Sequence, residues 1–184
     1  MRIAVSGTHF IGKSTLIDDF LKIHPEYKHE IEPYHDHTTE LSLEPSLESL
    51  CEQLDGSIEL INKHSNTQNI IFDRCPVDFL AYAMCISEQE ESDINDTEIA
   101  DRFADIKTAL NNVDLIVFLP ISKENDIIYT EENPAYRKLA DKCFKKLYRD
   151  EVCDIFPGYN HPRIIEVVGE RAARVKIVES YLVK

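Results

Sequence analysis

Short apolar runs alternate along this sequence with longer stretches in which apolar residues recur every three or four positions. A short apolar run bounded by polar residues is typical of a buried strand, and the longer period is typical of a helix with one buried face. The predicted strands are Arg2–Ser6, Tyr27–Glu32, Asn69–Asp73, Asp114–Leu119 and Arg163–Val168. The predicted helices are Leu47–Lys63, Glu98–Leu110, Ala135–Val152 and Ala172–Val183, with two more that begin at Lys13 and Pro76.

This alternation predicts an α/β fold in which a parallel sheet of five strands is covered by helices on both faces. Right-handed crossovers bring successive parallel strands into one sheet and place the helices on its two sides. Ligands of such sheets bind beyond the carboxyl ends of the strands. We expect a single domain over residues 1–184, because this length suits one core and no linker, repeat or low-complexity tract divides the chain.

Composition and charge narrow the class of protein. Hydrophobic residues make up 43% of the chain, which is enough for a packed core. The formal net charge of -14 argues against a protein that binds nucleic acid or an anionic membrane, and favours a small-molecule substrate. Five cysteines without a CxxC pair, and no signal-peptide pattern or membrane-length apolar run, predict free thiols and a cytoplasmic protein. The sequence does not indicate an oligomeric state.

The most informative motif lies between the first predicted strand and the first predicted helix. Residues 7–14 read GTHFIGKS and fit the phosphate-binding pattern G-x-x-x-x-G-K-[ST], the P-loop. The nucleotide-binding residues that it predicts are Gly7, Thr8, His9, Phe10, Ile11, Gly12, Lys13, Ser14 and Thr15. Main-chain amides at the helix N-terminus are expected to hold the phosphates of ATP, Lys13 to reach the β- and γ-phosphates, and Ser14 to ligate Mg2+.

A second candidate site follows the third predicted strand, which ends in Asp73 and is followed by Arg74. Both side chains are expected at the edge of the sheet where ligands bind. Asp73 can hold Mg2+ or accept a proton from an attacking hydroxyl, and Arg74 can bind a phosphate or a substrate carboxylate. The alternative for these two residues is an ion pair that only ends the strand.

Three segments together resemble the P-loop nucleoside kinases: GTHFIGKST at residues 7–15, Glu-Pro at residues 32–33, and FDRCPVDFLAY at residues 72–82. The similarity is greatest to the AAA-like ATPase and kinase group that contains the ribosylnicotinamide kinase domain of bacterial NAD regulators. This resemblance implies the three-layer P-loop NTPase fold of nucleoside and nucleotide kinases, with strand order 2-3-1-4-5. It also implies that Asp73 and Arg74 act at the centre of phosphoryl transfer and that Glu32 faces the acceptor.

Taken alone, the segment around Glu32 leaves several interpretations open, because other acids and histidines lie close to it and each is able to face solvent. His35 and His37 are of a type that ligates zinc, yet no third or fourth ligand stands at a recognised spacing. The acidic segment Ser87–Asp96 favours a solvated loop over a metal site, since it lacks the glycine and the ligand spacing of an EF-hand.

The predicted helix Ala135–Val152 carries a group of basic residues in an otherwise acidic chain. Those expected to face solvent, opposite the apolar face, are Lys138, Lys142, Lys145, Lys146 and Arg149. Arg137 instead lies at the edge of the apolar face and is expected to point inward. In kinases similar to this chain, a lid supplies arginines to the transferring phosphoryl group. This makes the region around residues 121–137 the candidate lid and Arg137 its candidate arginine, with Lys138 as a second cation.

The favoured function is therefore ATP- and Mg2+-dependent phosphoryl transfer to a small nucleoside- or nucleotide-like acceptor. Its catalytic candidates are Lys13, Asp73, Arg74, Arg137 and Glu32, and its candidate metal ligands are Ser14 and Asp73. The alternatives are an ATPase or nucleotide-dependent switch that acts on a macromolecular partner, and a sensor without turnover. Residues 62–65 read NKHS and lack the aspartate of guanine-specific NKxD GTPases, which disfavours GTP switching.

Overall fold

The structure is a computed structural model that describes residues 1–31, 46–123, 133–150 and 152–182. Five parallel strands form one sheet in the order β2-β3-β1-β4-β5, which confirms the order that the resemblance implied. The strands are β1 (Arg2–Ser6), β2 (Lys28–Glu30), β3 (Ile70–Asp73), β4 (Leu115–Phe118) and β5 (Arg163–Glu166). The α-helices are α1 (Lys13–Ile23), α2 (Leu47–Lys63), α3 (Pro76–Gln89), α4 (Phe103–Leu110), α5 (Pro134–Asp150) and α6 (Arg171–Glu179).

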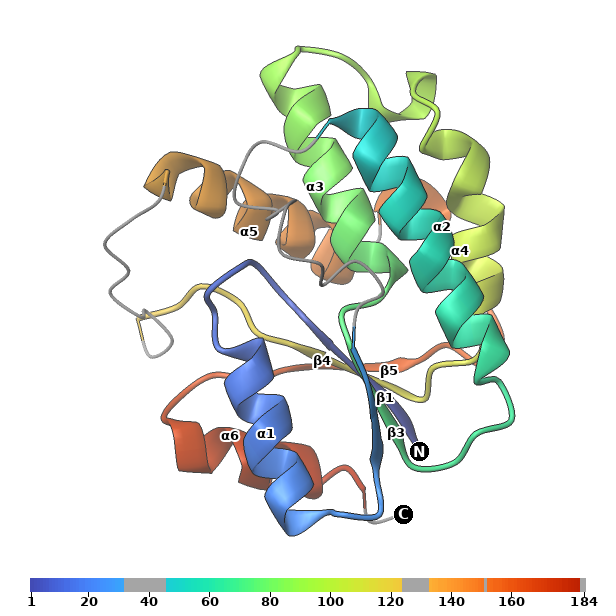
Figure 1. The fold of residues 1–184 in the computed structure, drawn as a ribbon. Coiled ribbons are helices and arrows are strands. Elements are labelled where there is room, and N and C mark those ends of the chain that lie inside the picture. The colour runs from blue at the N-terminus through green and yellow to red at the C-terminus, as the bar shows by residue number, and fades with distance from the viewer. Residues whose placement is uncertain (32–45, 124–132, 151, 183–184) are drawn as a thin grey trace.

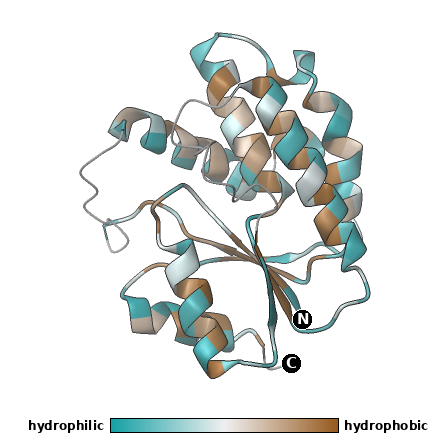
Figure 2. Ribbon diagram, in the orientation of Figure 1, coloured by the Kyte–Doolittle hydropathy of each residue, from teal (hydrophilic) through white to brown (hydrophobic). Residues whose placement is uncertain are grey.

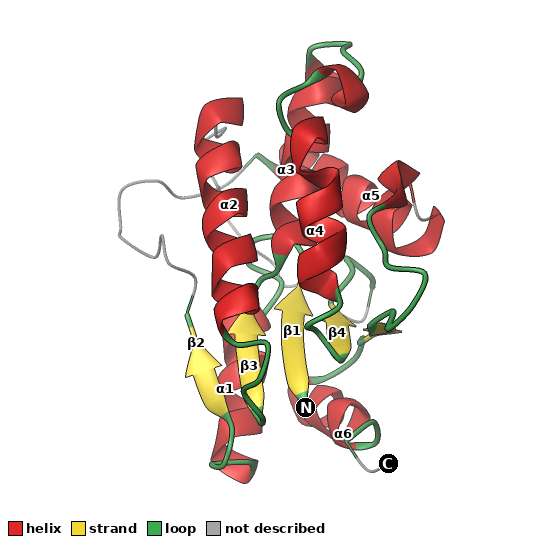
Figure 3. Ribbon diagram, turned by 90° about the vertical axis from the view of Figure 1, so that its right-hand side faces the viewer, coloured by secondary structure: helices red, strands yellow, loops and turns green. Residues whose placement is uncertain are grey.

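A layer of helices covers each face of the sheet. α1 and α6 lie on one face, whereas α2, α3, α4 and α5 lie on the other (Figure 1). The turned view in Figure 3 shows β2, β3, β1 and β4 side by side, all pointing the same way. Alternate side chains of β1 pack against the two helical layers. Ala4 belongs to the apolar cluster beneath α2–α5, whereas Ile3 and Val5 belong to the cluster beneath α1 and α6. Because both faces are covered, the strands read as continuous apolar runs.

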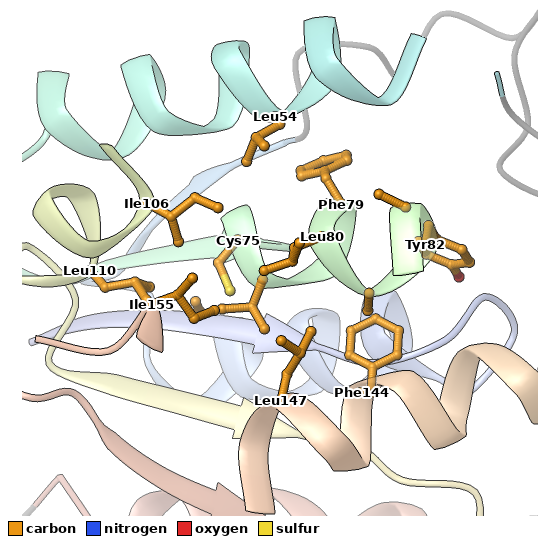
Figure 4. Packing of buried hydrophobic residues seen from close by; sticks show 14 of the residues in the cluster. Leu54, Cys75, Phe79, Leu80, Tyr82, Ile106, Leu110, Phe144, Leu147 and Ile155 are labelled. Carbon is orange, nitrogen blue, oxygen red and sulfur yellow. The ribbon is translucent and has the colours of Figure 1, made fainter. Parts of the chain in front are cut away.

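The larger apolar cluster lies between the sheet and α2–α5. Figure 4 shows Leu54 of α2, Leu80 of α3, Leu110 of α4 and Leu147 of α5 within this cluster. In Figure 2 the hydrophobic residues are concentrated in the central strands and on the helix surfaces that pack together. Burial of each such side chain contributes about 1.5–3 kcal/mol, so this layer holds α3 and α5 firmly against the sheet.

Two of the predicted boundaries are wrong for physical reasons. The segment Ser87–Asp96 is not wholly a loop, because α3 continues to Gln89 and a 3-10 turn, η1, covers Ile94–Asp96. The Glu88 carboxylate forms ion pairs with two lysines of α5, and these contacts stabilise the last turn of α3 despite its polar sequence. The predicted helix Glu98–Leu110 begins with a separate 3-10 turn, η2 (Ala100–Arg102), and is α-helical only from Phe103.

The ends of the other predicted elements shift by a few residues. The second strand is shorter than predicted, β2 being Lys28–Glu30, and the last helix ends at Glu179. A further 3-10 turn, η3 (Val152–Asp154), follows α5. Along the parts of the chain that the structure describes, no helix combines the length and the apolar character needed to cross a membrane.

The five cysteines are free thiols, and four of them are buried. Cys75 stands at the N-terminal end of α3, where burial raises the pKa of its thiol well above the usual value. A buried, protonated thiol behaves as a small apolar side chain. The four buried cysteines therefore belong to the packing of the protein, and all five are free thiols, as the sequence predicts.

Candidate active site

The P-loop, residues 7–14, joins the carboxyl end of β1 to the amino end of α1. Gly7 has a φ of 140°, and a Cβ at this position would lie 2.6 Å from the carbonyl oxygen of Leu119. Gly12 is the N-cap of α1 and has a φ of 93°. Both conformations suit glycine, and they let the loop turn tightly past the end of β4. The amides at the N-terminus of α1 are thereby available to an anion.

Lys13 lies over the P-loop. Its ammonium group donates hydrogen bonds to the carbonyl oxygens of Gly7 at 2.9 Å and Thr8 at 2.8 Å, and the residue is only 7% exposed. The Thr8 hydroxyl oxygen is also buried, without a hydrogen-bond partner among the described residues. Because a buried hydroxyl without a partner costs free energy, it is a feature expected of a site shaped for a ligand.

The rest of the predicted nucleotide-binding residues divide into buried and exposed positions. Ile11 is fully buried and packs with α1 and α6. Phe10 is 36% exposed, and Ser14 and Thr15 expose their side chains in the first turn of α1. Ile11 therefore anchors the loop, and the two hydroxyls of α1 are accessible to a ligand.

The structure brings Ser14 and Asp73 together. The Ser14 hydroxyl donates a hydrogen bond of 3.4 Å to Asp73 Oδ2. Parallel pairing of β1 with β3 sets Val5 opposite Asp73, so the end of β3 lies beside the start of the P-loop. The other carboxylate oxygen, Oδ1, is buried and has no hydrogen-bond partner within the described ranges. A hydroxyl and a carboxylate at a phosphate-binding helix N-terminus are the oxygen donors that Mg2+ prefers.

Arg74 follows β3 in a left-handed backbone conformation, with a φ of 75°. Such a conformation costs a residue with a Cβ about 1–2 kcal/mol, so surrounding contacts must hold it. Its main-chain N–H donates a hydrogen bond of 3.0 Å to the carbonyl of Val5, and its guanidinium lies 3.6 Å from Asp78 Oδ1. Backbone strain of this kind is frequent at functional sites.

Asp78 is a site residue that the sequence analysis missed. This fully buried carboxylate accepts hydrogen bonds from the main-chain N–H of Gly7 at 3.2 Å and of Cys75 at 3.1 Å. It therefore joins the first residue of the P-loop to the start of α3 and to Arg74. Burial raises the pKa of Asp78, while the charges of Arg74 and Lys13 oppose that rise. The capping-box spacing from Cys75 to Asp78 is the signal that could have identified it.

Arg137 reaches the P-loop from α5. Its Nε donates a hydrogen bond of 3.3 Å to the carbonyl of His9, and its Nη2 is buried with no hydrogen-bond partner in the described parts of the chain. Burial, followed by the positive charges of Lys13, Arg74 and Arg137, lowers the pKa of His9 to about 4. Three cations thus converge on the P-loop, an arrangement that suits a polyanion such as a triphosphate.

The remaining basic residues of α5 lie away from the P-loop. Lys138 is exposed. The other four form ion pairs, which are Lys142–Glu88, Lys146–Glu88, Lys145–Asp141 and Arg149–Glu166. Surface pairs of this kind contribute about 0–1 kcal/mol each. They are therefore best understood as contacts between α5 and its neighbours, and Arg137 is the basic residue of α5 that binds the P-loop.

Several predicted positions lie outside the described residues. These are Glu32, His35 and His37, within the range 32–45, and residues 124–132 of the predicted lid. Glu30, two positions before Glu32, is described and forms an ion pair with Lys28, and its carboxylate lies 3.4 Å from Nε2 of His64. The candidate site as described is therefore built by the P-loop, the end of β3 and the helices α3 and α5.

Comparisons with known proteins agree with this fold. A family model described as "AAA domain" matches residues 2–171. The structure is similar to that of deoxyadenosine kinase from M. mycoides with bound dATP, with a TM-score of 0.72 and 19% identity over 100% of both chains. It is also similar to thymidylate kinase from Candida albicans, with a TM-score of 0.59 and 17% identity over 99% of this chain and 90% of that one. No curated protein matches the sequence significantly. Since the family model spans most of its length, the chain belongs to the AAA domain family, and it has the fold of the P-loop nucleoside and nucleotide kinases.

Proposed function

We propose that this protein transfers the γ-phosphoryl group of ATP, with Mg2+, to a hydroxyl of a small nucleoside- or nucleotide-like acceptor. The observation that carries the proposal is the contact of 3.4 Å between Ser14 of the P-loop and Asp73 of β3, beside a loop on which three cations converge. Phosphoryl transfer depends on positioning and charge neutralisation more than on covalent chemistry, and this group of residues supplies both. The likeness of the fold to deoxyadenosine and thymidylate kinases supports a nucleoside-like acceptor.

In this proposal, the P-loop amides and Lys13 bind the phosphates of ATP. The Lys13 ammonium exchanges carbonyl partners of the loop for phosphate oxygens, which are stronger acceptors because they are charged. Arg74 and Arg137 neutralise the negative charge of the transferring phosphoryl group. Arg137 suits this task because its Nη2 has no hydrogen-bond partner among the described residues. Glu32, outside those residues, is kept as the candidate contact to the acceptor.

Asp73 has one of two tasks. As the acceptor oxygen forms its bond to the γ-phosphorus, the bond from phosphorus to the ADP oxygen breaks and the acceptor hydroxyl loses a proton, which the Asp73 carboxylate can take up. Alternatively, Asp73 holds Mg2+ together with Ser14, whose hydroxyl lies 3.4 Å from the carboxylate. When bound, the metal ion supplies charge neutralisation at the phosphates.

The proposal is tested by measuring ADP release with Mg2+ over a panel of nucleosides, nucleotides and phosphorylated metabolites. A kinase forms ADP slowly alone and faster when its acceptor is present. ADP release that no small molecule stimulates but a macromolecule does would identify a switch instead. Tight ATP binding without any ADP release would identify a sensor.

Two variants examine the assigned residues. Asp73→Asn should keep ATP affinity while losing transfer, because the amide neither takes up a proton nor carries the negative charge that Mg2+ requires. Asp101→Asn is the matched control, since Asp101 is exposed in the turn η2. Lys13→Ala should abolish nucleotide binding or turnover. Undiminished turnover in Asp73→Asn would contradict the role assigned to that carboxylate.

A further inference from the structure

His9 joins the P-loop to two helices of the larger layer. Its main-chain N–H donates a hydrogen bond of 3.0 Å to the hydroxyl of Tyr82 in α3, and its carbonyl accepts the hydrogen bond from Arg137 in α5. Its ring stacks with those of Tyr82 and Tyr136, at centroid distances of 6.2 Å and 6.3 Å. His9 is therefore the point at which the P-loop, α3 and α5 meet.

The Tyr82 hydroxyl binds both the main chain and the ring of His9. Besides accepting the main-chain N–H, its oxygen lies 3.1 Å from Nδ1 of the imidazole. The phenol proton can be donated to Nδ1 only if that nitrogen carries no proton of its own. Burial and three neighbouring cations lower the pKa of His9 to about 4, and burial raises the pKa of Tyr82 to about 12. At neutral pH the imidazole is thus neutral and the phenol protonated. In the tautomer that carries its proton on Nε2, the Tyr82 hydroxyl donates to Nδ1 while it accepts the main-chain N–H of His9.

Both arginines of the candidate site contact this pair. The Arg74 guanidinium lies over the Tyr82 ring, 5.8 Å from its centroid, while Arg137 binds the carbonyl of His9. Figure 4 shows Tyr82 at the end of the large apolar cluster, near Phe144. The two rings meet edge to face with centroids 5.9 Å apart, so the cluster fixes the orientation of the phenol.

From these contacts we propose that His9 and Tyr82 form a positioning pair that sets Arg74 and Arg137 against the P-loop for phosphoryl transfer. This inference rests on the proposed kinase function. If Tyr82 only filled the core, phenylalanine would serve as well, because the ring makes the apolar contacts. If His9 and Tyr82 position the arginines, removal of the Tyr82 hydroxyl slows phosphoryl transfer more than it weakens ATP binding. The reason is that the arginines act chiefly in the transition state.

The test is Tyr82→Phe, which removes only the hydroxyl. Tyr159→Phe is the matched control, since Tyr159 is 86% exposed. ADP formation is measured at varied ATP with saturating acceptor, at a temperature where circular dichroism finds every variant folded. We expect kcat of Tyr82→Phe to fall about ten- to a hundredfold, as for a misplacement of catalytic groups. The KM for ATP should stay within about threefold, and the control should match the wild type.

A double-mutant cycle with Arg137→Ala provides the decisive readout. If the hydroxyl acts through Arg137, its removal lowers kcat less in the Arg137→Ala background than in the wild type. An equal fall in both backgrounds, an unchanged kcat in Tyr82→Phe, or a change in KM alone would each overturn the positioning pair. A wild-type protein that forms no ADP in response to any acceptor would overturn the proposed function instead, before any variant is compared.

Discussion

Two arginines bind carbonyl groups of the P-loop from opposite helical layers, and they differ in how their other donors are used. Arg137 of α5 binds the carbonyl of His9 through Nε and keeps Nη2 buried, without a hydrogen-bond partner in the described chain. Arg174 of α6 binds the carbonyl of Ile11 through Nη1 at 3.1 Å and that of Gly169 through Nε at 2.8 Å. The two helical layers thus hold the same loop from both sides.

This difference separates a structural arginine from one suited to catalysis. Arg174 is 8% exposed. Its hydrogen bonds to the carbonyls of Gly169 and Ile11 connect the start of α6 to the P-loop. The carbonyls of His9 and Ile11 flank Phe10, whose φ of 53° is left-handed, so the two arginines stabilise this strained turn together. Contact with a P-loop is therefore not in itself evidence that an arginine is catalytic. A better indicator is a buried guanidinium nitrogen without a hydrogen-bond partner among the described residues, such as Nη2 of Arg137.

The largest expected effect is that of Arg137→Ala. We expect kcat to fall about a thousandfold, because an arginine that neutralises the transferring phosphoryl group contributes at least that much. ATP affinity and the midpoint of thermal unfolding should change little. Steady-state kinetics and calorimetric titration with ATP measure both quantities. A loss of stability with kcat unchanged would place Arg137 in the same structural class as Arg174.

Gly7→Ala tests the loop that both arginines hold. The added Cβ would meet the Leu119 carbonyl at 2.6 Å in a backbone conformation unsuited to alanine. We expect the free energy of unfolding to fall by about 3 kcal/mol, with loss of ATP binding. Gly158→Ala is the control, since the added Cβ has no atom within 4 Å other than those of its own residue and its two chain neighbours. Chemical denaturation gives both values, and equal stability of the two variants would show that the tight turn at Gly7 is not required.

Arg174→Ala should have the opposite profile to Arg137→Ala. Removal of its hydrogen bonds leaves two carbonyls without these donors, and we expect a fall of about 2 kcal/mol in the free energy of unfolding. At a temperature where the variant is folded, kcat should remain within about threefold of the wild type. A fall in kcat as large as that of Arg137→Ala would remove the distinction between the two arginines.

The smallest expected effect concerns pH and His9. Burial and the charges of Lys13, Arg74 and Arg137 lower the pKa of His9 to about 4, so between about pH 6.5 and pH 4 the unfolded chain binds a proton there that the folded chain does not. Tyr82, whose pKa burial raises to about 12, keeps its proton over this range. His9 therefore contributes less stability as the pH falls.

The variant His9→Phe keeps a ring but cannot titrate. Chemical denaturation at pH 6.5, 5 and 4 gives the free energy of unfolding of both proteins. The wild type should lose part of its stability advantage over His9→Phe as the pH falls, so that the difference in free energy is smallest near pH 4. The control is the same comparison in high salt, where the buried group should behave similarly because it is screened little. A stability difference that is constant across the range would contradict the lowered pKa.

The sequence predicted those parts of the site that depend on local order. The P-loop has a recognisable spacing, Asp73 and Arg74 follow a recognisable strand, and the helical period set Arg137 apart from its basic neighbours. Tyr82 and Arg174 could not be found in this way, and Asp78 only through its capping-box spacing from Cys75. Asp78 meets Gly7 across 71 residues and Arg174 meets Ile11 across 163, so these contacts depend on the strand order and on how α3 and α6 pack.

The most direct test of the proposed kinase function is a single-turnover reaction with ATP labelled at the γ-phosphate, with Mg2+ and each acceptor of the nucleoside panel. Separation of the products shows where the label goes. We predict that the label appears in an acceptor with the wild-type protein and stays in ATP with Asp73→Asn. Label that appears only in inorganic phosphate, or transfer that Asp73→Asn carries out as fast as the wild type, would contradict the account.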